Sequence, residues 1–174
     1  MSPKEIAARI DAAGTAIEAE LGTMGEELAS WHPAEGEWCV KEVLGHIMQT
    51  ERIGFAGRIV EILAADEPSL RATGDAPPSC DRNLAEMLAE FREQRTRSVD
   101  QVAGLQPADL LRGGVHLRVG RLTVNDILHE WVHHDQAHLK QVLSNIQAYV
   151  WPQMGGAQGF AGLNNAQGSA PSAE

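Results

Sequence analysis

Residues 123–151 read TVNDILHEWVHHDQAHLKQVLSNIQAYVW, and they carry the clearest structural signal in the chain. Apolar side chains recur there every three or four positions, at Val124, Ile127, Leu128, Trp131, Leu139, Val142 and Ile146. This spacing is typical of an amphipathic α-helix with one buried face. Thr123 and Asp126 have the spacing of a capping pair at its start. The stretch therefore predicts one long helix that packs against other helices.

Three further segments show helical spacing, at about residues 3–30, 39–65 and 81–104. Gly14, Gly22 and Gly25 weaken the first of them, so the helix can bend. A Pro- and Gly-bearing connection covers residues 66–79, and an irregular one with a short extended piece covers 105–122, but no run alternates convincingly as a strand would. Four such helices predict an all-α domain, a four-helix bundle over residues 1–151. Residues 152–174 are rich in Gly, Ala, Ser, Asn and Gln and are expected to be a mobile tail.

The composition narrows the classes of partner. The chain has 14 basic and 24 acidic residues, a net charge of −10, and no Lys/Arg cluster that would bind nucleic acid. No apolar run is long enough to span a bilayer, and residues 1–6 lack the order of a signal peptide. We therefore expect a cytoplasmic protein that binds a small-molecule substrate and neither nucleic acid nor membrane. Cys39 and Cys80 are too few for a disulfide framework or a cysteine-built zinc site.

Three histidines lie where inward-facing side chains are expected. His134 and His138 lie along the edge of the apolar face of the last helix, and their spacing of four places them on the same side. His46 lies in the apolar stripe of the second helix. Three imidazoles from two facing helices are a suitable donor set for one metal ion in a bundle interior. From the residues alone, an equally good interpretation is that each histidine is a hydrogen-bonded core residue.

A second histidine pattern overlaps the first. Residues 129–133 read HEWVH, which matches the zinc-protease pattern H-E-x-x-H. His129 and His133 lie opposite Trp131 on the helix, however, so they are expected to face solvent, and position 139 is Leu where the longer pattern has another histidine. Glu130 and His133 also supply one Glu-x-x-His step of a di-iron bundle, but the second step is absent. Both interpretations therefore rank below the three-histidine site.

Three polar residues near the candidate ligands each have two interpretations. Asp135 falls toward the apolar side of its helix, where it would either orient an imidazole or pair with an Arg from a neighbouring helix. Gln141 is one turn from His138 and would either line the pocket or be solvated. Glu42 is one turn before His46 and would either line the pocket or, more often, cap its helix.

Four further residues in or just before the second predicted helix bear on the candidate site. Trp38 is expected to plug the end of the bundle rather than stack on a substrate. Cys39, at a helix N-terminus, would either be inert or have a lowered pKa. Gly54 and Gly57 would leave room for a substrate or for water.

Two motifs resemble those of a known family. Residues 33–46 read PAEGEWCVKEVLGH and look like the loop, tryptophan and first histidine of the DinB-like (DinB/YfiT-like) metal-binding proteins. Residues 134–141 read HDQAHLKQ and are similar to the histidine pair of that family's final helix. The resemblance covers residues 3–150 and implies a four-helix bundle with a long crossover connection, often a homodimer. It also implies one divalent metal ion (Ni, Zn, Fe or Mn) held by His46, His134 and His138. Cys39 departs from the family, which usually has Ser or Thr at that helix start.

The resemblance extends to function. Three neutral imidazoles leave a bound ion its full charge and an open position, so the ion can acidify a water for hydrolysis or bind a low-molecular-weight thiol as thiolate. Some members of the family are thiol-dependent transferases or isomerases, and others are hydrolases. We therefore expect a metal-dependent enzyme, with thiol S-transfer slightly ahead of hydrolysis. The alternative is a non-catalytic metal-binding module, a sensor or dimeric scaffold whose coordination sphere is closed by protein groups.

Overall fold

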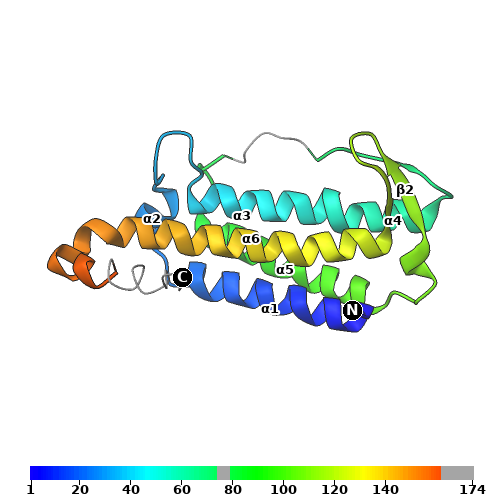
Figure 1. Cartoon of the computed structure of the whole chain (residues 1–174), viewed down its shortest axis with the longest axis horizontal. Coiled ribbons are helices and arrows are strands. Elements are labelled where there is room, and N and C mark those ends of the chain that lie inside the picture. The colour runs from blue at the N-terminus through cyan, green and yellow to red at the C-terminus, as the bar shows by residue number, and fades with distance from the viewer. Residues whose placement is uncertain (74–78, 162–174) are drawn as a thin grey trace, which may run out of the picture.

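The computed structural model describes residues 1–73 and 79–161, and most of them are helical (Figure 1). The helices are α1 (Pro3–Gly22), α2 (Glu26–Ser30), α3 (Val40–Gln49), the π-helix η1 (Thr50–Gly57), α4 (Arg58–Ala64), α5 (Leu84–Ala103), the short 3-10 helix η2 (Asp109–Leu111), α6 (Val124–Val150) and the 3-10 helix η3 (Trp151–Ala157). The strands are β1 (Ser69–Leu70), β2 (Gly113–His116) and β3 (Gly120–Thr123).

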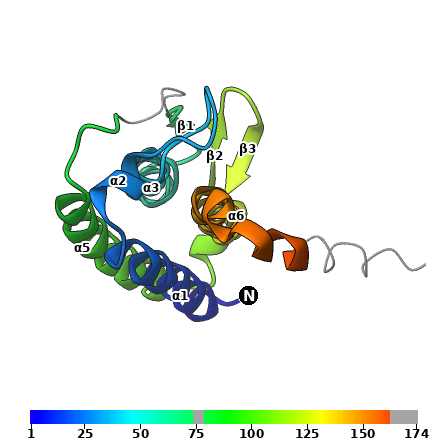
Figure 2. The ribbon, with the colours of Figure 1, turned by 90° about the vertical axis from the view of Figure 1, so that its left-hand side faces the viewer.

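Four long helical rods form the bundle, as Figure 2 shows from one end. The helix α1 packs against α5 and α6, and α3 packs against the same two helices from the opposite corner. The rod formed by α3, η1 and α4 runs in the same direction as α5, so the connection between them returns along the length of the bundle (Figure 1). The fold is therefore the predicted all-α four-helix bundle with a long crossover connection.

The helix ends follow the capping chemistry of the sequence, with some corrections. The Ser2 hydroxyl accepts from the Glu5 N–H, and the Thr123 hydroxyl accepts from the Asp126 N–H, so α1 and α6 both start with a capping box. The helix predicted over 81–104 starts later, at Leu84, because Asn83 caps it. The one predicted over 3–30 is interrupted at 23–25, next to the glycines that weaken it.

The second predicted helix is continuous from Val40 to Ala64 but contains a π-helical segment that the sequence did not indicate. A Cβ on Gly57 would lie 2.5 Å from the Arg52 carbonyl oxygen, so glycine allows this wider turn to close. A Cβ on Gly54 would lie 3.0 Å from a methyl group of Thr73. The expectation that glycine leaves room for a substrate or for water is therefore wrong at Gly54, because side chains fill the space, whereas Gly57 also lines a surface hollow with Ile53 and Val60.

A small sheet at one end of the bundle corrects the expectation of no convincing strand. The strand β2 pairs with β1 in parallel and with β3 in antiparallel orientation. The strands have two to four residues, too few for a recognisable alternation of apolar and polar side chains. Gly114 permits the close approach of β1, because a Cβ there would lie 2.7 Å from the Pro68 carbonyl oxygen.

The buried apolar residues form two clusters, one toward each end of the bundle. The first includes Ile6, Ile10, Phe55, Ile59, Val102, Ile127 and Trp131, and the second includes Ile17, Leu21, Val43, Leu44, Leu84, Phe91 and Val142. Between them lies a polar layer that belongs to neither cluster and contains Glu51, Arg95 and Asp135, all at most 3% exposed.

Arg95 joins the four rods at this polar layer. Its guanidinium group lies 2.8 Å from Glu51 on η1 and 2.6 Å from Asp135 on α6, and it donates to the Ile10 carbonyl of α1. Burial disfavours the charged guanidinium, but the two carboxylates outweigh that effect and raise the pKa of Arg95. A Cβ on Gly14 would lie 3.0 Å from Cγ of Arg95, so α1 approaches closely where it has no side chain.

The cysteines and the chain end add two observations. Cys39 is paired with Cys80, with the sulfur atoms 2.50 Å apart, a contact that neither sequence interpretation of Cys39 included. Residues 151–161 continue from α6 as helical turns, and residues 162–174, the remainder of the predicted mobile tail, lie outside the described residues. Within the described part of the chain, no helix is both long and apolar enough to cross a membrane.

Replacing Arg95 by Met should lower the free energy of unfolding by about 3–5 kcal/mol, because Glu51 and Asp135 would remain buried without their counter-charge. Urea denaturation followed by circular dichroism measures this. Arg92→Met is the matched control, since Arg92 lies one turn earlier on α5 and forms a surface ion pair with Glu18, which is expected to contribute less than about 1 kcal/mol. Equal losses in the two variants would contradict the assigned role of Arg95.

Candidate metal centre

The structure brings together the three histidines that the sequence singled out. One donor atom from each of His46, His134 and His138 lies within 4.8 Å of the other two. The Nε2 atoms of His46 and His134 are 3.1 Å apart, and the ring centroids of His134 and His138 are 4.3 Å apart. All three side chains are half-buried. The group therefore has the convergence expected of ligands to one ion.

The helix rotation that creates this group is set by its neighbours. His46 lies on α3 and the other two histidines on α6, and these helices pack side by side. Asp135 points into the bundle toward Arg95. Successive helical residues are about 100° apart, so fixing Asp135 also fixes the direction in which His134 leaves the helix. The buried ion pair thus orients a candidate ligand without contacting it.

Burial lowers the pKa of two of the three imidazoles, those of His46 and His138, and so favours their neutral form. Burial, with smaller contributions from His138 and His134, lowers the pKa of His46 to about 4. Burial and the neighbouring His134 also lower the pKa of His138, against the opposing effect of its hydrogen bond to Gln141. A neutral imidazole has a free lone pair on one nitrogen, which is the form that binds a metal ion.

Gln141 fixes which nitrogen of His138 is available. Its Oε1 atom lies 2.9 Å from Nδ1 of His138, and because an amide oxygen only accepts, Nδ1 carries the proton. The lone pair of His138 is therefore on Nε2. Of the two interpretations of Gln141, this contact fits the one that places it at the site. It binds the outer nitrogen of a candidate ligand.

The distance between donors fits an ion. Metal–imidazole bonds of about 2.0–2.1 Å place two ligand nitrogens roughly 2.9 Å apart at a right angle and roughly 3.3 Å apart at the tetrahedral angle. The 3.1 Å between Nε2 of His46 and Nε2 of His134 falls between these limits. A shared divalent cation is therefore consistent with the positions of the residues present.

Three further side chains border the histidines. The Thr50 hydroxyl lies 3.5 Å from Nε2 of His46, and the Phe55 ring packs edge-on against His134 with centroids 5.2 Å apart. Trp38 packs against His46 with centroids 5.0 Å apart, so it covers the site as well as the end of the bundle. The roles of Thr50 and Phe55 were not predicted, because the π-helix that holds them has no sequence signature.

The other candidate residues lie elsewhere. Of the two interpretations of Asp135, the structure has the ion pair with an Arg, and the partner is Arg95. A signal for Arg95 existed, since it continues the apolar spacing of α5 as a basic residue. Glu42 accepts from the Cys39 N–H at 2.8 Å, so it caps α3 instead of lining the histidine site. His32 Nε2 is also 3.0 Å from the Glu42 carboxylate.

The competing H-E-x-x-H pattern is not brought together. His133 is exposed, as expected, and His129 is half-buried and hydrogen-bonded through Nδ1 to the Asn125 carbonyl on its own helix, at 2.8 Å. Neither residue belongs to a potential metal-binding group among the described residues. The zinc-protease and di-iron interpretations therefore have no geometric support.

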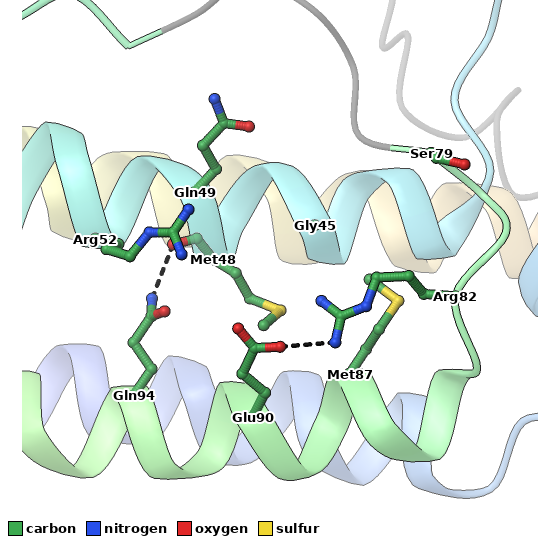
Figure 3. A pocket seen from close by; sticks show the side chains of 9 residues that line it. All are labelled: Gly45, Met48, Gln49, Arg52, Ser79, Arg82, Met87, Glu90 and Gln94. Carbon is green, nitrogen blue, oxygen red and sulfur yellow. Dashed lines mark hydrogen bonds and ion pairs between the residues drawn. The ribbon is translucent and has the colours of Figure 1, made fainter.

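A separate pocket opens between α3 and α5, and Figure 3 shows its lining. There Arg82 pairs with Glu90 at 2.7 Å, and Gln94 donates to the Met48 carbonyl at 2.8 Å. None of the three histidines lines this pocket. It lies on a different side of α3 from His46, so the metal centre and this pocket are distinct features.

Comparisons with known proteins identify a family and agree with the fold. The family model described as the DinB superfamily matches residues 9–142. The fold matches YfiT from Bacillus subtilis, described as a probable metal-dependent hydrolase with an unusual four-helix bundle topology, with a TM-score of 0.75, 16% identity, and coverage of 88% of this chain and 87% of that one. No curated protein matches the sequence.

Two further solved structures have the same fold. TT2238, a four-helix bundle protein, matches with a TM-score of 0.62 and 22% identity over 82% of this chain and 99% of that one. A conserved protein from Enterococcus faecalis matches with a TM-score of 0.58 and 14% identity over 85% of this chain and 97% of that one. At these identities the matches establish the fold alone.

The metal-free protein should become less stable as the pH falls from 7 toward 4. The pKa of His46 is about 4 in the folded chain against an ordinary value of 6.5, so the unfolded chain binds more protons in that interval. We expect the urea midpoint of chelator-treated protein to fall between pH 7 and pH 5, and His46→Gln to flatten that dependence. Identical pH dependence in the two proteins would refute a depressed pKa at His46.

Proposed function

The chain belongs to the DinB superfamily, and from this we propose that it is a metal-dependent enzyme in which His46, His134 and His138 hold one divalent cation. The observation that carries the proposal is the convergence of their donor atoms within 4.8 Å at the polar layer of the bundle. Imidazole donors suit zinc, nickel, iron and copper. We propose nickel, zinc or iron as the resident ion on these donors, with manganese as a further candidate that the resemblance to the DinB-like family implies.

The donor set determines what chemistry is available. A divalent cation held by three neutral ligands would supply Lewis acidity, either to acidify water for hydrolysis or to favour the thiolate of a small thiol. The chain's own residues prepare the site for this: Gln141 holds the proton of His138 on Nδ1, and Phe55 and Trp38 cover the imidazoles with apolar surface. The Thr50 hydroxyl, beside His46, can form a hydrogen bond with a bound substrate.

We place hydrolysis ahead of thiol transfer. This ordering is supported by the description of YfiT as a probable metal-dependent hydrolase. Transfer or isomerisation with a low-molecular-weight thiol is the second candidate reaction, which the same three-histidine chemistry would serve. A sensor or dimeric scaffold is the non-catalytic alternative. The substrate in the catalytic cases is a small molecule.

His134→Ala should abolish stoichiometric metal binding, because it removes one of three ligands. Elemental analysis of protein purified without a histidine tag measures the metal content. The control is His133→Ala, which changes the adjacent exposed histidine on the same helix and should keep one ion per chain. Equal metal content in the two variants would remove the basis for the site.

The reaction itself is tested on metal-loaded protein offered model esters and amides in one experiment and a small thiol with an electrophile in another. We expect hydrolysis that is lost on chelation and in His134→Ala but kept in His133→Ala. Thiol-dependent turnover alone would favour the second candidate. No metal-dependent turnover in either experiment would favour the sensor or scaffold.

A further inference from the structure

A second group of potential metal ligands lies at the N-terminal end of α3. It consists of His32 in the loop before α3, Cys39 at the N-cap of that helix, and Cys80 in the turn before α5, and its donor atoms all lie within 4.8 Å of one another. Cys39 and His46 are seven residues apart on one helical rod, which corresponds to roughly 10 Å along the axis. This group is therefore separate from the three-histidine centre.

We propose that, in the reduced protein, His32, Cys39 and Cys80 bind a second metal ion, a thiophilic divalent cation such as Zn²⁺. In the structure the two sulfurs are paired. Low-molecular-weight thiols supply two electrons and two protons to reduce this pair and are themselves oxidised to a disulfide. Each cysteine then releases its proton to solvent as its sulfur binds the ion, so binding of the metal needs no further redox step.

The backbone geometry suits sulfurs that share an ion. The Cα atoms of Cys39 and Cys80 are 7.1 Å apart, beyond the usual disulfide range of roughly 4.4–6.8 Å. Two thiolates bound to one cation need no direct bond between the sulfurs, so a wider Cα separation is acceptable.

Glu42 prepares the histidine of this group. Its carboxylate lies 3.0 Å from Nε2 of His32 and accepts from the Cys39 N–H at 2.8 Å. One nitrogen of the imidazole is thus held by a carboxylate, and the other is available to an ion, which is the usual arrangement of a metal-binding histidine. The contact gives Glu42 a role beyond capping, at this group instead of at the histidine centre.

The exposure of His32 gives an ion a route into the site. Cys39 is fully buried, Cys80 is half-buried, and the His32 side chain is 46% exposed. An ion can therefore reach the sulfurs from the side of His32. Two cysteines alone are too few for a zinc site, as the sequence indicated, but His32 adds a third donor. Two thiolates and one imidazole match the donor set of Cys₂His zinc sites, in which a fourth position remains for water or another ligand.

Cobalt distinguishes the two sites, because only cysteine ligands produce an intense near-ultraviolet thiolate-to-cobalt charge-transfer band. Untagged full-length protein is treated with a phosphine reductant, freed of metal and titrated with Co²⁺. We expect two ions per chain together with the charge-transfer band. His134→Ala should keep the band and lose one ion, and Cys80→Ser should lose the band and keep one ion.

A second variant guards against misfolding of the cysteine mutant. The His32 side chain is 46% exposed, so His32→Ala should fold normally. It should weaken Co²⁺ binding at the sulfur-containing site by about tenfold or more, which is the cost of losing even an outer partner of a ligand. His133→Ala, another exposed histidine, is its control and should leave both ions and the band unchanged. A reduced wild-type protein without the band, or a band insensitive to His32→Ala, would overturn the proposal.

Discussion

Arg95 is the constraint on which the rest of the bundle depends. A guanidinium group at the centre of a helical domain is costly to desolvate unless carboxylates and carbonyls surround it. Here those partners come from η1, α6 and α1, while Arg95 itself lies on α5. The partners of this one cation therefore fix how each of the four rods is rotated about its own axis. Apolar contacts are interchangeable and do not fix that rotation as specifically.

The same constraint prepares the metal centre. Because the side chain of Asp135 points to Arg95, the side chain of the neighbouring His134 points from α6 toward α3. There it lies beside His46, which is five residues before the buried Glu51. Burial of the His46 side chain at this position lowers its pKa to about 4. Its imidazole is therefore neutral and has a free lone pair. The ion pair between Asp135 and Arg95 thus both stabilises the fold and orients His134.

The two groups of potential ligands differ in chemistry, although both involve the first half of the α3 rod. The three histidines are neutral donors inside the bundle, whereas the group at the end of the bundle has two sulfurs beside an exposed histidine. Borderline cations such as zinc, nickel and iron suit the first set, and thiophilic ones suit the second. Gln141 in the first group and Glu42 in the second have the same function. Each contacts one nitrogen of an imidazole, Gln141 that of His138 and Glu42 that of His32.

The sequence by itself determined the bundle and placed the three histidines on inward-facing sides of their helices, because a period of three or four residues specifies which side of a helix is buried. Helical spacing alone left open whether they bind a metal ion or are hydrogen-bonded core residues. The sequence also separated His134 from the conspicuous but outward-facing His133. Only the tertiary structure identified Arg95 as the partner of Asp135, placed Glu42 with His32, and paired Cys39 with Cys80. These contacts join residues 10 to 41 positions apart, and helical periodicity describes each helix alone, without its rotation against the others. The π-helix and the sheet pairing escaped prediction for a related reason, since close packing at Gly57 and Gly114 shapes them rather than any repeat in the sequence. The short extended piece expected within residues 105–122 is present as β2.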